Sequence, residues 1–171
     1  MCIKSCVGFT LLEFVATMTI VSIMVTIGIP SFLDMITKHR LKGATETIYG
    51  DLQLARMEAI KRNKNISLTF QTVGIQNWCY AMHDEDDCDC NKSNDCRIGD
   101  KTSMVTSGEK FEDVDLKTNF KHNSTSFNPV RGASNSGSII LTARKKTSRL
   151  IVSSRGRVRV CSDDLMDYPA C

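Results

Sequence analysis

The stretch Gly8-Phe9-Thr10-Leu11-Leu12-Glu13 and the apolar run that follows it to Pro30 decide how this chain is organised. Between Phe9 and Pro30 the only charged side chain is that of Glu13. At about 1.5 Å per residue, a helix over this run would be roughly 33 Å long, about the thickness of the hydrocarbon core of a bilayer. The run therefore predicts a membrane-spanning helix over 9–30, with one carboxylate near its start.

The carboxylate of Glu13 needs a partner, because an unpaired charge is costly in lipid. A cut between Gly8 and Phe9 would create an α-amino group one helical turn away, which could neutralise this carboxylate or that of a neighbouring copy. The segment 1–8 carries one Lys and no acid, and it is too short for an ordinary secretory signal. We therefore expect 1–8 to be a cleaved leader, 9–30 a membrane or filament helix, and 31–171 a globular head that includes the second half of the helix.

The block GFTLLEFVATMTIVSIMVTIGIPSF, which begins at Gly8, resembles the class III signal of type IV prepilins and type II secretion pseudopilins. The resemblance implies cleavage after Gly8 by a prepilin peptidase, N-methylation of Phe9, and packing against other pilins in a filament, with Glu13 as the assembly residue. It also implies a bacterial inner-membrane location with a periplasmic head, and then an extracellular pilus. The alternative, a plain signal anchor, leaves Glu13 unexplained.

The charges of the 171-residue chain are unevenly distributed, although the formal net charge is only +3. The segment 84–100 is acidic, whereas 117–162 contains no Asp or Glu. The bases of that second segment are Lys117, Lys121, Arg131, Arg144, Lys145, Lys146, Arg149, Arg155, Arg157 and Arg159. This asymmetry favours a polyanionic partner.

The cysteines predict disulfides. Cys2 and Cys6 would leave with the leader, and the remaining six form an even set in a head that crosses to the oxidising side of the membrane. These six are Cys79, Cys88, Cys90, Cys96, Cys161 and Cys171. We favour Cys161 with Cys171, closing the tail, and the other four among themselves.

Beyond Pro30, apolar residues recur at spacings of three and four, which predicts a helix that continues to about Arg62 and packs along one side. The positions are Leu41, Ala44, Ile48, Leu52, Ala55 and Ala59. Strands are expected over 66–70, 78–82, 138–141, 150–152 and 157–161. The segment 54–62 and the strand after it resemble FimT/GspH-type minor pilins and pseudopilins. We thus expect an α+β, pilin-like fold: a long N-terminal helix packed on an antiparallel sheet, with Val114, Leu116 and Phe120 in the core.

The acidic segment 84–100 has some features of a metal site. Asp87, Asp89, Asn91, Ser93 and Asp95 fall at EF-hand-like positions, but Lys92 replaces the turn glycine and Ile98 the bidentate glutamate. Cys88, Cys90 and Cys96 lack the paired spacing of zinc sites. We expect a disulfide-bonded loop with no metal and no cofactor. The three histidines have no nucleophile motif beside them, so we expect no enzyme.

The last predicted strand alternates, so Val158 and Val160 should face the core while Arg157 and Arg159 share the other face. Two residues span roughly 6.6 Å of strand, close to two phosphate steps of DNA. Gly156 would give the turn freedom and leave room for a nucleic-acid backbone. Arg155, with the predicted hairpin loop 143–147 (Arg144, Lys145 and Lys146 in it) and Arg149, could extend the strand into a patch that grips phosphates irrespective of base sequence.

The motif Gly156-Arg157-Val158-Arg159 resembles the Gly-Arg-x-Arg motif of FimT-type minor pilins, which are implicated in binding DNA for natural transformation. The resemblance implies double-stranded DNA as a partner. Two alternatives remain. The arginines could discourage edge-to-edge aggregation of strands, and the chain could be a structural minor pilin or a GspH-like pseudopilin that acts in filament assembly or protein secretion.

Overall fold

The fold is that of a computed structural model, which describes Gly8 and residues 10–72, 77–84, 88–92, 95–99, 101–102 and 105–171. Of the residues named above, Cys2, Cys6, Phe9, Asp87 and Ser93 lie outside these ranges, as does the predicted leader apart from Gly8. The chain divides into two compact units, Met1–Ile36 and Thr37–Cys171. One helix, α1 (Leu11–Arg62), contributes to both. The helix predicted to continue past Pro30 is therefore present.

The N-terminal unit consists of the first half of α1, whose large apolar side chains are exposed. Within the described residues, α1 is the one helix long and apolar enough to cross a membrane, by length and composition. Thr10 caps its start, since its Oγ1 accepts a hydrogen bond from the Glu13 N–H at 3.2 Å. The hydroxyls of Thr17, Thr19, Ser22 and Thr26 donate to backbone carbonyls three or four residues earlier. The segment can thus enter lipid with these donors already paired.

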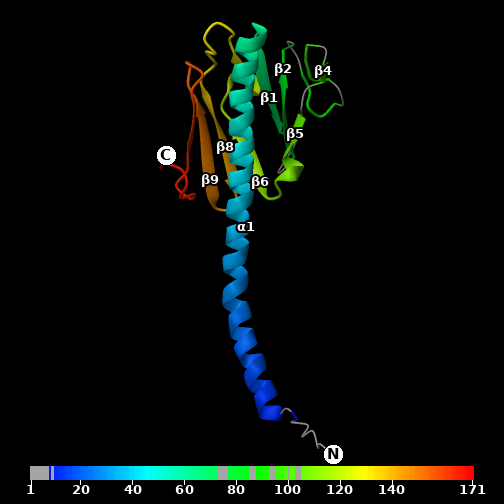
Figure 1. The fold of residues 1–171 in the computed structure, drawn as a ribbon, viewed down its shortest axis with the longest axis vertical. Helices are drawn as coiled ribbons and strands as arrows, with labels where there is room; N and C mark the ends of the chain where they lie inside the picture. Colours follow the sequence, from blue (N-terminus) through cyan, green and yellow to red (C-terminus); the bar gives the residue numbers. More distant parts are fainter. Residues whose placement is uncertain are drawn as a thin grey trace, which may run out of the picture. The chain divides into compact units, whose positions relative to one another are not determined.

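The antiparallel β-structure predicted for the head is present, as two four-stranded sheets (Figure 1). The first has the order β5-β2-β1-β7, and the second has the order β10-β9-β8-β6. The strands of the first are β1 (Ile66–Thr72), β2 (Trp78–His83), β5 (Val105–Ser107) and β7 (Ser124–Phe127). Those of the second are β6 (Val114–Thr118), β8 (Gly137–Ala143), β9 (Lys146–Val152) and β10 (Val158–Cys161). A small pair, β3 (Arg97–Ile98) and β4 (Lys101–Thr102), lies within or just after the predicted acidic loop.

The second half of α1 packs on both sheets. Figure 1 shows its cyan part running between the green strands β1 and β2 on one side and the yellow-to-orange strands β8 and β9 on the other. Its apolar stripe from Leu41 to Ala59 has no exposed surface, which confirms the helical spacing read from the sequence. Val114, Leu116 and Phe120 are buried as predicted. This core fixes α1 relative to the strand ends that bear the candidate site.

The polar atoms of Trp78 and Tyr80 are both hydrogen-bonded inside the core. The indole Nε1 of Trp78 donates to the carbonyl of Val114 at 2.7 Å, and the hydroxyl of Tyr80 donates to Asp51 at 2.6 Å. Burial raises the pKa of Tyr80 far above its ordinary value, with the hydrogen bond to Asp51 adding to the effect. The hydroxyl therefore stays protonated and ties β2 to α1.

Three disulfides are present in the head. Cys161 pairs with Cys171, as favoured from the sequence, and the other four pair among themselves as Cys79 with Cys90 and Cys88 with Cys96. The tail is also held by Lys42, whose Nζ lies 2.6 Å from a carboxylate oxygen of Asp167. This hydrogen bond is the main reason that the pKa of Asp167 lies below its ordinary value.

Candidate nucleic-acid interface

The turn between β9 and β10 presents the arginines of the candidate site. Gly156 N–H donates to the carbonyl of Ser153 at 2.8 Å, and Ser153 N–H donates to the carbonyl of Arg157 at 3.0 Å. Gly156 has φ of 70°, in the left-handed region that favours glycine. These bonds close a tight turn in which Arg155 and Arg157 are exposed.

The alternation predicted for the last strand is largely present. Val158 is buried and Arg159 is exposed, but Arg157 precedes β10, which begins one residue later than expected. Val160 is only partly buried and packs at the edge of the core. Residues paired across two strands share a face of the sheet. Arg159 pairs with Ile151, and Cys161 pairs with Arg149. Because Arg149 and Ile151 are two residues apart on one strand, both pairs lie on the same face. Arg149 and Arg159 therefore point outward from the same side of the sheet.

The basic hairpin does not join this group. Ala143 pairs with Lys146, so the connection between β8 and β9 is a two-residue turn of Arg144 and Lys145, shorter than the loop expected. It lies at the far end of β9, and the strand from Lys146 to Val152 separates it from the β9–β10 turn by roughly 20 Å. An acid lies beside it, because Thr147 N–H donates to Asp164 at 2.7 Å. The proposed single patch is thus corrected to two separate basic ends.

The role expected for Gly156 also needs correction. Gly156 is buried, so it does not leave an open path for a nucleic-acid backbone. A Cβ at this position would lie 1.7 Å from the carbonyl oxygen of Gly132. The glycine is required because the β9–β10 turn packs directly on the loop that contains Gly132.

Arg56 of α1 is the site residue that sequence reasoning missed. It lines a groove of about 700 Å³ together with Ile151, Ser153, Ser154, Arg155, Arg157 and Arg159. Arg56 directly follows Ala55 of the apolar stripe and so flanks the core. This position beside the apolar stripe was the one sign in the sequence that Arg56 lies close to the sheets. The groove itself forms only where the β9–β10 turn meets α1.

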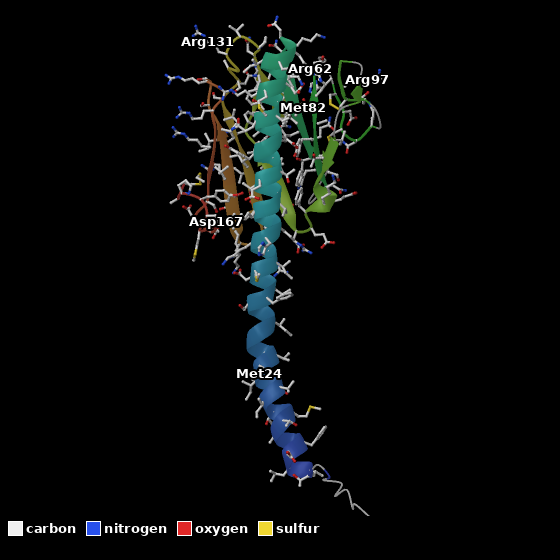
Figure 2. The ribbon with its side chains drawn as sticks, viewed as in Figure 1. Met24, Arg62, Met82, Arg97, Arg131 and Asp167 are labelled. Carbon is white, nitrogen blue, oxygen red and sulfur yellow. A yellow bond between two sulfur atoms is a disulfide. The ribbon has the colours of Figure 1, made fainter. Side chains whose placement is uncertain are left out.

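The groove is strongly basic. Within the part of the chain that the structure describes, none of the guanidinium groups of Arg56, Arg155, Arg157 and Arg159 has a carboxylate oxygen within 4.0 Å, the distance at which an ion pair is counted. Arg131 is exposed on the loop beside Gly132, and Figure 2 places it at the end of the head where α1 ends at Arg62. Four arginines without local neutralisation make this surface suited to an anion.

Comparisons with known proteins identify the fold and the family. The family model described as type II transport protein GspH matches residues 44–163. The type IV minor pilin FimU of Pseudomonas aeruginosa has 18% sequence identity and a TM-score of 0.53, and the match covers 71% of this chain and 88% of FimU. The minor pseudopilin EpsH of the type 2 secretion system of Vibrio cholerae has 14% identity and a TM-score of 0.52, with 72% and 97% covered. A search of curated proteins found no match.

The family match includes Arg56, Gly132 and the β9–β10 turn, but not the segment from Gly8 to Glu13. The family is one of structural pilins and pseudopilins, which implies contact with other pilins in a filament, and the exposed apolar half of α1 fits membrane anchoring. The fold resembles both a pilus subunit and a secretion pseudopilin. The chain belongs to the GspH family, and it is a GspH/FimT-type minor pilin or pseudopilin with a pilin fold.

Proposed function

We propose that this minor pilin binds double-stranded DNA outside the cell, without regard to base sequence, for uptake in natural transformation. The observation that carries the proposal is the groove in which Arg155, Arg157 and Arg159 meet Arg56. None of these four arginines is ion-paired with an acid among the described residues. Guanidinium groups suit phosphate because their planar donors can bind two oxygens at once.

The spacing of the arginines supports backbone binding. Arg157 and Arg159 lie two residues apart, roughly 6.6 Å along an extended chain, so each can reach a different phosphate of one DNA strand. None of the described residues that line the groove is aromatic, so none of them can stack on a base. Affinity should therefore come from phosphates, be similar for all sequences, and fall steeply with salt.

Protection of a sheet edge explains less of the pattern. β10 is an edge strand of the second sheet, where outward arginines can discourage aggregation. Arg155 lies in the turn, however, and Arg56 lies on α1, so neither protects the strand edge. A polyanionic partner accounts for all four arginines of the groove.

We also propose that the N-terminal segment is processed and anchors the protein in the membrane. Prepilin peptidase would remove residues 1–8, Phe9 would be N-methylated, and 9–30 would hold the protein in the inner membrane with its head, from 31 onward, in the periplasm before entry into a pilus. The support is the exposed apolar half of α1, with Thr10 and Glu13 at its start. Glu13 would then pair with an α-amino group within the filament.

Replacement of both Arg157 and Arg159 by Gln is expected to lower affinity for duplex DNA by on the order of a hundredfold at low salt, because two charge-assisted contacts are lost. The slope of log K against log salt should also become shallower by about 1.8. The measurement is a fluorescence-anisotropy titration of the full chain, in non-ionic detergent micelles, with a duplex of mixed sequence at several salt concentrations.

The matched control replaces Arg144 and Lys145 by Gln, which removes the same charge at the other end of β9. This control variant should lose little DNA affinity, because the Arg144–Lys145 turn is farther from the groove than the ~10 Å over which charges act at 0.1 M salt. Equal losses in the two variants would show that total charge alone governs binding. A wild-type chain that is folded but binds no duplex would instead favour a structural role in assembly or secretion, with the groove facing an acidic subunit.

A further inference from the structure

We infer that the floor of the arginine groove is a site for a single phosphodiester group, and that Arg56 is its fixed ligand. This inference rests on the proposed function, because it names the group that the DNA would place in the groove. It goes beyond the proposed function because it assigns a role to a residue of α1, outside the Gly-Arg-x-Arg motif. Arg56 would bind from the helix side, opposite the arginines of the β9–β10 turn.

The side chain of Arg56 is accommodated by two glycines from separate segments. A Cβ on Gly132 would lie 2.6 Å from the Nε of Arg56 and 2.8 Å from its Cγ, and a Cβ on Gly156 would lie 3.4 Å from the same Nε. Both glycines have positive φ, 61° and 70°. The absence of side chains at these two positions leaves the space that the stem of Arg56 fills, so the guanidinium is held in place rather than free in solvent.

Arg56 has no ion pair with the described residues of the head. Its Nε is buried and has no hydrogen-bond partner among the described residues. A buried donor without a partner lowers stability, and an apolar side chain of similar length would fill the same space without that cost. The charge of Arg56 therefore makes no contact that would stabilise the described part of the head. An anion bound in the groove would provide a partner for it.

The rim and the floor of the groove differ in rigidity. Arg155, Arg157 and Arg159 are exposed, so each must lose side-chain freedom when it binds. Arg56 is partly buried and already confined by Gly132 and Gly156, so it loses less on binding. We expect the phosphate that enters the groove to contact Arg56 at the floor and an arginine of the turn at the rim.

The test replaces Arg56 by Met, which keeps the stem against Gly132 and removes both the charge and the buried Nε. The full chain in non-ionic detergent micelles should bind the duplex about tenfold more weakly, with a salt slope shallower by about one, as expected for one lost phosphate contact. Its melting temperature should be unchanged or higher, followed by the fluorescence of Trp78, the only tryptophan, which is buried in the head.

Two companion variants sharpen the result. Arg144→Met removes one charge outside the groove and should leave DNA affinity nearly unchanged. Combining Arg56→Met with the Arg157→Gln/Arg159→Gln pair should lower affinity by less than the product of the separate losses, because groups that share one phosphate act together. Independent, multiplicative losses would contradict a shared phosphate and overturn the inference.

The outcomes separate this inference from the proposed function. If Arg56→Met binds DNA like the wild type while the Arg157/Arg159 variant loses binding, the head is a DNA receptor and Arg56 is not a ligand. If Arg56→Met melts at a clearly lower temperature, the fold needs the guanidinium and the inference fails. If the wild-type chain binds no duplex, the proposed function fails, and this inference fails with it.

Discussion

Alanine in place of Gly156 is expected to destabilise the head by about 3 kcal/mol, although it adds only one methyl group. The added Cβ would lie 1.7 Å from the carbonyl oxygen of Gly132 and 2.9 Å from its carbonyl carbon. The obstacle is backbone, so it cannot swing aside as a side chain can. The left-handed φ of 70° adds a cost of about 1 kcal/mol for any residue with a Cβ.

Thermal unfolding of the full chain in non-ionic detergent micelles, followed by Trp78 fluorescence, should show a melting temperature lower by about 10 °C. Gly132→Ala provides a graded comparison, because the close atoms there belong to a side chain, that of Arg56, and not to the backbone. Its loss of stability should therefore be smaller. Gly50→Ala is the opposite control. Nothing lies within 4 Å of its added Cβ on α1, so it should stabilise the helix by about 0.5–1 kcal/mol.

A Gly156→Ala head as stable as the wild type would mean that the β9–β10 turn does not pack on the Gly132 loop as described. The variant also bears on binding. If the turn shifts away from Gly132, Arg155 and Arg157 move relative to Arg56, so DNA affinity should fall even under conditions in which the head stays folded.

Alanine in place of Glu13 is expected to leave membrane insertion intact and to reduce incorporation into filaments by at least about tenfold. Insertion should persist because the apolar run is unchanged and a costly charge is removed from it. Assembly should fail because the α-amino group proposed for Phe9 would then lack its carboxylate partner. The measurement compares the amount of the protein in sheared filaments with the amount in membranes.

Two further variants distinguish charge pairing from helix capping at this position. Thr10 accepts a hydrogen bond from the Glu13 N–H, so Thr10-Leu11-Leu12-Glu13 also has the form of a capping box. Glu13→Gln keeps the capping capacity without the charge and should still fail to assemble, whereas Thr10→Ala removes the cap and should assemble. The reverse pattern would assign Glu13 to the helix end rather than to a partner subunit.

Much of the head could be predicted from local patterns. The stripe from Leu41 to Ala59 predicted which face of α1 is buried, because helical spacing alone puts those positions on one side. Parts of strands β1, β2, β8, β9 and β10 were also recognised, β1 and β10 from their alternation. β2, however, is buried at every position, and β9 begins at Lys146, four residues before the predicted strand. The strands β5, β6 and β7 were not, since they are short and weakly patterned and are defined by their neighbours: β7 by β1, β6 by β8 and β5 by β2.

The sequence by itself determined the family resemblance, the apolar half of α1, the buried stripe of its second half and the outward arginines of the last strand, because each depends on residue type and spacing along one segment. Only the tertiary structure decided that the hairpin turn at Arg144 lies at the far end of β9, that Gly156 packs on Gly132, and that Arg56 completes the groove. These are contacts between segments far apart in the chain, and the periodicity of a single segment carries no information about which other segment it will meet.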